Sequence, residues 1–355
     1  LAVSVERYDI TASPRSALAS DANTPSVTEA LGKIAALTGQ DPAALMAALT
    51  SDPQSDFAYL TKGVTLEVFQ AVRDLDIPWV YFELRPSRTY PNGAVAGNLV
   101  GFIGTDGPQA GLELTEDACL AATNGSATYE KGEDGVQLPG SIVTTEEAKN
   151  GGTLRLTIDR DLQFYVQQRM AQTAADLGAT TTTAVVMRVS DGALMAVADY
   201  PSVDPNNVGG VPNTALGSLA FSSPYEPGST MKVLTTATLV DAGIANAGTQ
   251  VVAPGRLYLS DGSSIKDAWA HDDTRYTLAG ALVDSSNTAF SILSGPVDPE
   301  LRRDYMLKFG LNRETEVGFN GEAEGDVPPT KNWDERTNYN VQFGQGLTTT
   351  AVQLA

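Results

Sequence analysis

The chain has 355 residues, of which 42% are hydrophobic and 19% charged, a composition that argues against an intrinsically disordered chain and fits two or three domains. Its 23 basic and 43 acidic residues leave a formal charge of −20, which repels a phosphate backbone, so we expect no nucleic-acid partner. One histidine and one cysteine exclude a clustered zinc site and an intrachain disulfide, and we expect neither a metal ion nor a cofactor.

The first 75 residues predict an irregular start followed by helices. Residues 1–25 are polar and show no periodicity. Between residues 27 and 75, apolar residues recur at helical spacing in three stretches, which predicts three helices with short breaks. Asp41 precedes Pro42, a pair that fits the N-cap and the first position of the middle helix.

An extended segment and a glycine-rich stretch complete the first part of the chain. Residues 79–91 predict extended backbone, and residues 105–152, which are rich in Gly, Thr and Asn, predict loops and short strands. Lys149-Asn150-Gly151-Gly152 is the best candidate for a linker in the chain. We therefore predict one domain over residues 1–150 and a second over residues 151–355.

The second part opens with a sharper pattern. Residues 153–158 alternate as in a strand, and Asp159 fits the N-cap of a helix that ends near Gly178. Two apolar runs, 183–189 and 193–198, flank an Asp-Gly turn and predict a β-hairpin. Both runs show little polar alternation, which is typical of strands that are covered on both faces.

The segment around Ser229 carries the first chemical signal. Pro227-Gly228 makes a tight turn, after which Ser229 opens a helical pattern that runs to Gly243. Residues three apart on a helix share a face, so Ser229 and Lys232 should lie side by side at its N-terminus. Apolar residues on several faces of this pattern predict a buried helix.

This predicted geometry suits nucleophilic catalysis. A serine hydroxyl needs a neighbouring base before it can attack a carbonyl. A lysine can be that base only when it is neutral, and its ordinary pKa of about 10.4 can be lowered by burial and by nearby charge. The free N–H groups of the first helical turn also favour negative charge that develops on a substrate.

A Ser-x-x-Lys match is weak evidence by itself, because both residues are common. A second match, Ser263–Lys266, lies in a predicted loop with no helical pattern behind it, and we interpret it as chance. A further element, Ser285-Ser286-Asn287, lies 56 residues after Ser229 and follows a predicted helix at 277–283. The two motifs in this order and spacing are far rarer than either one.

The single histidine offers an alternative. A Ser-His-Asp triad would have to use His271, which lies in the polar run Ala270-His271-Asp272-Asp273. We interpret His271 instead as a solvated loop residue.

The combination of motifs resembles the penicillin-binding protein and serine β-lactamase superfamily, whose set comprises Ser-x-x-Lys, Ser-x-Asn and Lys-Thr-Gly. The resemblance extends along most of the chain and points to class B penicillin-binding proteins of the cell-division type. Besides the two motifs and the hairpin, it rests on six segments: 88–91, 97–102, 111–113, 156–159 with 162–163, 201–206, and 342–346 with 353–355.

Two features depart from the family pattern. Lys-Thr-Gly is absent and the chain ends at Ala355, so we expect a transpeptidase domain that is truncated before this motif. Arg15 is followed by Ser16, a poor match to the N-terminal Arg-Gly element of class B members. The resemblance implies an α+β fold, in which an elongated, non-catalytic pedestal or dimerisation-type domain precedes an incomplete α/β serine transpeptidase domain.

The resemblance further implies a serine D,D-transpeptidase. Ser229 would attack the carbonyl of the penultimate D-Ala in a stem peptide while Lys232 takes its proton, and the Ser229 N–H would be one oxyanion donor. Ser285 would relay protons, and Asn287 would hydrogen-bond Lys232 or the substrate backbone. An amine from a neighbouring stem would resolve the acyl-enzyme, and a β-lactam would acylate the same serine.

The implied partners are peptidoglycan stem peptides, β-lactam antibiotics, a membrane glycosyltransferase and division proteins. No run of 18 apolar residues occurs, so we expect no membrane span in this chain. The resemblance implies a protein held on the extracytoplasmic face of the cell membrane by an N-terminal helix that this chain lacks. Two alternatives remain. A β-lactam-hydrolysing or sensing relative would lack a domain like residues 1–150, and a noncatalytic scaffold of the division or elongation machinery would not need intact motif residues.

Overall fold

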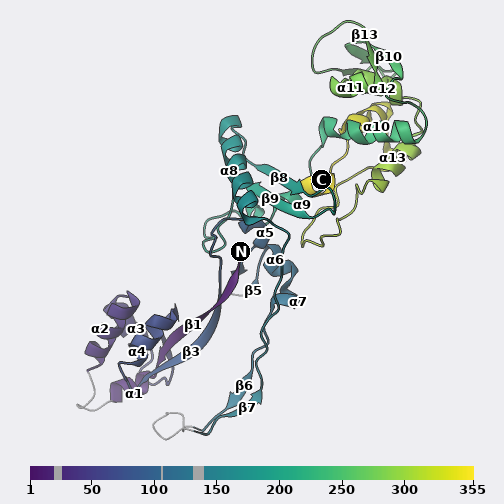
Figure 1. Ribbon diagram of the computed structural model, residues 1–355. Helices are drawn as coiled ribbons and strands as arrows, with labels where there is room; N and C mark the ends of the chain where they lie inside the picture. The colour runs from purple at the N-terminus through teal and green to yellow at the C-terminus, as the bar shows by residue number, and fades with distance from the viewer. Residues whose placement is uncertain (20–25, 105–106, 131–139) are drawn as a thin grey trace. The chain divides into compact units, whose positions relative to one another are not determined.

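The computed structural model describes residues 1–19, 26–104, 107–130 and 140–355 (Figure 1). These divide into two compact units. The first unit comprises Leu1–Gly93 and Cys119–Thr153, and the second comprises Ala94–Ala118 and Leu154–Ala355. The domain limits 1–150 and 151–355 stay a prediction, and the units differ from them chiefly in the segment 94–118.

The first unit is built on a three-stranded antiparallel sheet in the order β2-β1-β3. Its strands are β1 (Val3–Ala12), β2 (Ala58–Val64) and β3 (Val80–Thr89). The extended segment at 79–91 is thus confirmed. The expectation of an irregular start at 1–25 is wrong for residues 3–12, because they form the central strand β1, and residues 20–25 lie outside the described residues. Its polar Asp9 is buried and accepts hydrogen bonds from Arg85 at 3.1 Å and from the Gly63 N–H at 2.7 Å.

The helices of the first unit pack on this sheet around Trp79, which is 2% exposed. They are α1 (Pro14–Ala19), α2 (Val27–Thr38), α3 (Pro42–Thr50) and α4 (Leu66–Arg73). The three predicted helices are confirmed, including the cap of α3, where the Asp41 carboxylate accepts from the Ala43 N–H at 2.9 Å. Strand β2, which lies between α3 and α4, was not predicted.

The rest of the first unit has little regular structure among the residues described. The strands β6 (Ser126–Thr128) and β7 (Val143–Glu146) pair antiparallel and are exposed, in keeping with the predicted loops and short strands. In the candidate linker, the Gly152 N–H donates to the Cys119 carbonyl at 2.7 Å. Part of the predicted loop region, residues 105–106 and 131–139, lies outside the described residues.

The second unit contains the predicted helix and hairpin. Helix α8 (Arg160–Leu177) is capped by the Asp159 carboxylate and ends at Gly178, and it packs on the antiparallel pair β8 (Thr182–Met187) and β9 (Leu194–Tyr200). The strand predicted at 153–158 is wrong. The segment before α8 runs beside the start of β9 but is joined to it by isolated hydrogen bonds, such as Thr157 Oγ1 to the Leu194 carbonyl at 2.7 Å, rather than by a ladder.

Residues 94–118 are part of the second unit, and buried polar contacts join them to its remaining residues. The Asn98 amide donates to the Ala215 carbonyl at 3.0 Å and accepts from the Val203 N–H at 3.1 Å. A Cβ at Gly97 would lie 1.9 Å from the Val203 carbonyl oxygen, so the close approach needs glycine. The elements here are α5 (Gly97–Val100), β4 (Ile103–Gly104), β5 (Gly107–Pro108) and α6 (Gly111–Thr115), followed by α7 (Asp117–Leu120).

A helical part of the second unit surrounds α10 (Met231–Asp241), which follows the 3₁₀ turn η2 (Gly228–Thr230) and ends just before Gly243. The prediction of a helix buried on several faces holds only in part, because Leu239 is fully buried while Val233 is 58% exposed. The neighbouring helices are α11 (Leu278–Val283), α12 (Asn287–Ser294) and α13 (Pro299–Lys308).

Two short hairpin-like pairs lie between α10 and α11 in the chain. They are β10 (Gln250–Ala253) with β13 (Thr274–Thr277), and β11 (Arg256–Tyr258) with β12 (Ser264–Lys266). The remaining elements are η1 (Asn213–Ala215), α9 (Leu219–Ser222), η3 (Thr330–Asn332), α14 (Glu335–Asn340), η4 (Val341–Phe343) and α15 (Ala351–Leu354). Within the described residues, none of the helices combines the length and apolar character that a membrane crossing requires.

Candidate active site

Ser229 and Lys232 lie side by side, as predicted. Ser229 is exposed in η2, and Lys232 is 1% exposed in the first turn of α10. The Lys232 Nζ donates to the Ser229 Oγ at 3.1 Å. The solvent-exposed Ser229 hydroxyl is thus hydrogen-bonded to the amine of Lys232, which is shielded from solvent.

The turn that presents Ser229 depends on a segment more than a hundred residues away. Gly228 has a φ of +60°, and its N–H donates to the Gly344 carbonyl at 2.9 Å. A Cβ at Gly344 would lie 2.1 Å from the Gly228 carbonyl oxygen, which only glycine avoids. The Glu226 carboxylate adds a hydrogen bond from the Gly346 N–H at 2.8 Å, so residues 344–346 support the turn.

Ser285 completes a three-residue cluster. The Lys232 Nζ donates to the Ser285 Oγ at 2.9 Å and to the Ser285 carbonyl at 2.5 Å. Ser285 has a φ of +57°, in the left-handed region that non-glycine residues seldom adopt. In this conformation both of its oxygens meet the same amine, so an ammonium group at Lys232 finds three acceptors for its three N–H bonds.

The electrostatics of Lys232 fit a general base. Burial lowers its pKa to about 8, although the negative charge of Asp267 acts in the opposite direction. A pKa near the working pH keeps an appreciable neutral fraction, which is the form that can accept a proton from serine. The cluster can therefore pass a proton between Ser229, Lys232 and Ser285.

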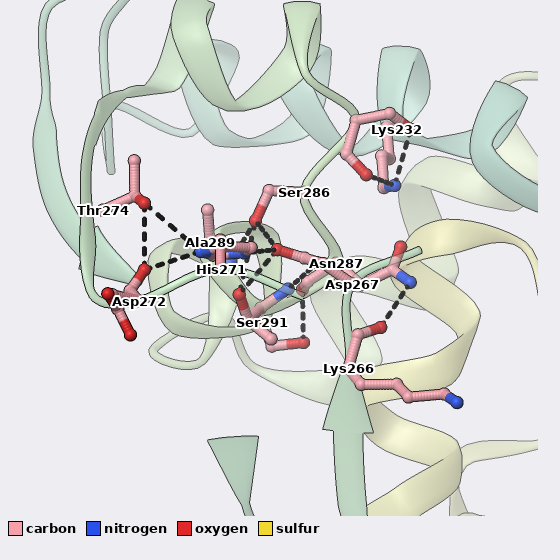
Figure 2. Close-up of polar contacts among 12 residues, drawn as sticks. Lys232, Lys266, Asp267, His271, Asp272, Thr274, Ser286, Asn287, Ala289 and Ser291 are labelled. Carbon is pink, nitrogen blue, oxygen red and sulfur yellow. Dashed lines mark hydrogen bonds and ion pairs between the residues drawn. The ribbon is translucent and has the colours of Figure 1, made fainter. Parts of the chain in front are cut away.

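Asn287 lies at the start of α12 and is anchored away from the lysine. Its side-chain amide donates to the Lys266 carbonyl at 3.0 Å (Figure 2). The geometry does not bring Asn287 into hydrogen-bonding contact with Lys232, so of the two roles expected for it only contact with the substrate stays a prediction. The second Ser-x-x-Lys match lies in β12 and its preceding turn rather than on a helix, in keeping with its interpretation as chance.

His271 is not the solvated loop residue that we expected. Its side chain is 11% exposed, and its Nε2 lies 2.9 Å from the Asp267 Oδ2. That carboxylate also accepts from the Ser286 hydroxyl at 2.7 Å (Figure 2), which places His271 beneath the Ser285–Asn287 turn. Sequence reasoning missed Asp267 altogether. The available signal was weak: an acidic residue directly after the short strand β12, in which only Ile265 is apolar.

The described part of the chain holds no cluster of three or more His, Cys, Asp or Glu residues that could bind a metal ion. The groups that the site itself offers are one amine, two hydroxyls and the backbone around them. Such a set matches a serine nucleophile with a lysine base.

Comparison with known families and proteins agrees with this geometry. Residues 182–355 match the family model of the penicillin-binding protein transpeptidase domain, and residues 1–156 match that of the penicillin-binding protein dimerisation domain. Penicillin-binding protein PbpB of Mycobacterium tuberculosis is 39% identical over 316 residues, which cover 88% of this chain and 46% of that protein.

Two further relatives extend the comparison. Peptidoglycan D,D-transpeptidase FtsI of Escherichia coli is 29% identical over 313 residues, 88% of this chain and 52% of that protein. The crystal structure of a peptidoglycan synthetase from Bifidobacterium adolescentis is 31% identical with a TM-score of 0.72, and the match covers 100% of this chain and 68% of that one. The chain spans about half the length of the two curated relatives.

Proposed function

The chain belongs to the class B penicillin-binding proteins, and from this membership we propose that it is a serine D,D-transpeptidase that cross-links peptidoglycan. The family and the α+β fold class predicted from sequence are confirmed. The observation that carries the proposal is the continuous hydrogen-bonded cluster of Ser229 Oγ, Lys232 Nζ and Ser285 Oγ, with separations of 3.1 and 2.9 Å.

In the proposed acylation step, the Ser229 Oγ attacks the carbonyl carbon of the penultimate D-Ala in a stem peptide. The neutral Lys232 amine takes the hydroxyl proton. Ser285, which contacts the same amine, relays a proton to the leaving amino group of the terminal D-Ala. The C–N bond breaks, and an ester between the stem peptide and Ser229 remains.

In the second step, an amine from a neighbouring stem peptide attacks this ester. Its proton passes back through Ser285 and Lys232 to the Ser229 oxygen, so the catalyst is regenerated. The Ser229 N–H, exposed at the head of α10, serves as one oxyanion donor. Asn287, held at the rim by the Lys266 carbonyl, contacts the substrate backbone.

A β-lactam acylates the same serine, because its strained amide presents a carbonyl to the same nucleophile. The dimerisation-domain match over residues 1–156 argues against a stand-alone β-lactamase or sensor. The assembled Ser229–Lys232–Ser285 cluster argues against a noncatalytic scaffold, which would not need a lysine pKa of about 8.

Residues 1–150 serve as the non-catalytic pedestal domain and residues 151–355 as the transpeptidase domain. We place the protein at the extracytoplasmic face of the cell membrane, where its substrate is assembled. A membrane glycosyltransferase that supplies nascent glycan strands and other proteins of the division machinery are its expected partners. The name of the FtsI relative supports the transpeptidase activity.

Labelling of the intact protein with a fluorescent penicillin tests the proposal. A transpeptidase forms a covalent adduct at Ser229 that lasts for hours and also joins donor and acceptor stem peptides. An adduct that hydrolyses within seconds would identify a β-lactamase instead, and the absence of any adduct would identify a scaffold.

A further inference from the structure

The Asp267 carboxylate is the centre of a buried polar network outside the proposed catalytic cluster. Its side chain is fully buried. Its Oδ2 lies 2.9 Å from His271 Nε2 and 2.7 Å from the Ser286 hydroxyl (Figure 2). The Thr288 hydroxyl lies 3.1 Å from the same Oδ2, and the Thr288 N–H lies 3.1 Å from Oδ1. These four contacts come from a loop and from the first turn of α12.

The surroundings of His271 favour the imidazolium form. Its Nε2 faces the Asp267 carboxylate, and its Nδ1 lies 2.7 Å from the Asp272 carbonyl oxygen, which can only accept, and 3.2 Å from the Thr274 hydroxyl, which can donate or accept. The imidazolium satisfies both the carboxylate and the carbonyl, whereas a neutral ring donates to only one of them. The hydrogen bonds to Asp267 and to the Asp272 carbonyl accordingly raise the pKa of His271, and the protonated ring forms an ion pair with Asp267.

The network acts directly on the motif residue next to Ser285. Ser286 is the N-cap of α12, where its Oγ accepts from the Ala289 N–H at 3.0 Å while its hydroxyl donates to Asp267. Ser286 is fully buried, and its hydroxyl has the Asp267 Oδ2 at 2.7 Å and the Thr288 Oγ1 at 3.3 Å within reach. Its neighbour Ser285 has a positive φ, the conformation in which both its oxygens reach Lys232.

The same carboxylate also bears on the charge of the proposed base. Asp267 is the charged group whose field acts on Lys232, and it favours the protonated amine. When protonated, His271 places a positive charge 2.9 Å from that carboxylate and offsets its field. Three further titratable groups surround the pair. Burial and the charges of Asp284 and Asp267 raise the pKa of Tyr276 on β13, and Asp272 raises the pKa of His271.

We propose that Asp267 and His271 form a positioning pair for the active site. Asp267 holds the Ser285–Asn287 turn against Lys232, and the His271 charge offsets the effect of Asp267 on the protonation of that lysine. Neither residue touches the substrate. The inference rests on the proposed function, in that the acylation of Ser229 is one of its two readouts.

The first experiment measures the second-order rate constant of Ser229 acylation by a penicillin between pH 5.5 and 10 in the intact protein. Asp267→Asn should lower the maximal rate constant by about 10- to 100-fold, the range for losing a hydrogen bond to a charged group. It should also move the midpoint of the acylation pH profile downward, because loss of the negative charge of Asp267 lowers the pKa of Lys232. His271→Gln should move the midpoint upward, because the Asp267 charge is left without its partner.

The matched control is Asp199→Asn. Asp199 is also a buried aspartate of the second unit that accepts from a serine hydroxyl, Ser218 Oγ at 2.7 Å, and from a backbone N–H, that of Ala220 at 3.0 Å. It lies outside the proposed site. A purely structural role for Asp267 predicts that all three variants lose active protein while their pH midpoints coincide with that of wild type, and this result would overturn the proposal.

The second experiment is independent of acylation. The imidazole resonance of His271, assigned by its loss in His271→Gln, is titrated by NMR in wild type and in Asp267→Asn. The proposal requires a lower His271 pKa in the Asp267→Asn protein, and equal values would refute the pair. If Asp267→Asn does not fold, the acylation pH profile of His271→Gln tests the pair by itself. An upward shift of its midpoint supports the pair, and an unchanged midpoint refutes it. If wild type forms no Ser229 adduct but the His271 pKa falls in Asp267→Asn, the proposed function is wrong and the ion pair is supported.

Discussion

The Lys232 Nζ lies 2.9 Å from the Ser285 Oγ, although the two residues are 53 positions apart in the chain. Ser285 reaches this contact from a left-handed backbone conformation at the end of α11, with a φ of +57°. The contact joins the two sequence motifs into one hydrogen-bonded cluster. The behaviour of the site should therefore depend on how firmly this turn is held, as well as on the serine and lysine themselves.

Ser229 should be the sole site of covalent modification by β-lactams. Its Oγ is the exposed hydroxyl that contacts Lys232 at 3.1 Å. Mass spectrometry of a penicillin-treated digest should find the adduct on the peptide that carries Ser229, and Ser229→Ala should abolish labelling. Ser263→Ala, in the other Ser-x-x-Lys match, is the control that should label normally. An adduct on Ser263 would contradict the assignment.

Lys232→Ala should slow acylation by about 10²- to 10⁴-fold, the usual contribution of a positioned base. Noncovalent binding of the penicillin before acylation should change far less. In wild type, the acylation rate constant should rise with pH through the lysine pKa of about 8, since the neutral amine is the active form. Stopped-flow acylation kinetics measure both quantities, and a rate constant within a few-fold of wild type would mean that Lys232 is not the base.

Gly344→Ala should disable the turn that carries Ser229. Both Gly344 and Gly346 have a φ of +76°, but a Cβ at Gly344 would lie 2.1 Å from the Gly228 carbonyl oxygen, whereas at Gly346 the nearest atom is 3.7 Å away. Gly346→Ala therefore carries only the left-handed backbone strain, about 1–2 kcal/mol. Gly344→Ala should lower stability further in urea unfolding and should slow acylation, while Gly346→Ala should acylate at nearly the wild-type rate. Equal stabilities and equal acylation rates of the two variants would argue against a close approach of Gly344 to the Gly228 carbonyl.

The Asp267–His271 pair should make stability depend on pH. Hydrogen bonds to Asp267 and to the Asp272 carbonyl raise the pKa of His271 in the folded protein above its unfolded value, against a smaller opposing effect of burial. The pair therefore contributes stability that is fully present below the unfolded pKa of about 6.5 and is lost as pH rises through the folded pKa. As pH rises above about 6.5, the urea unfolding midpoint of wild type should fall more than that of His271→Gln. Parallel plots of midpoint against pH for the two proteins would mean that the pair does not contribute to stability.

Labelling should not depend on a metal ion. The proposed chemistry uses one amine and two hydroxyls, and the chain contains one histidine and one cysteine. Dialysis of the intact protein against EDTA should leave the acylation rate constant unchanged. Loss of labelling that returns on addition of zinc would refute this expectation.

The amino-acid sequence alone determined the features that depend on neighbouring residues. Ser229 and Lys232 share a face because they are three apart on a helical pattern, and Asp159, Gly178 and the Asp-Gly turn mark the limits of α8 and of the β8–β9 hairpin. These features follow from local backbone geometry, so spacing and capping residues predict them. The family resemblance was visible for the same reason, since its motifs are short and contiguous.

Only the tertiary structure decided the contacts between distant segments. Strand β1 escaped prediction because its polar Asp9 is satisfied by Arg85, a partner 76 residues away. His271 looked like a solvated residue because its neighbours in the chain are polar. Its side chain is instead largely shielded, because Asp267, which is bound by Ser286 at the N-cap of α12 and by Thr288 in its first turn, offers it a charged partner. A buried charge is tolerable only when partners from elsewhere in the fold reach it, and one sequence does not show which residues will do so.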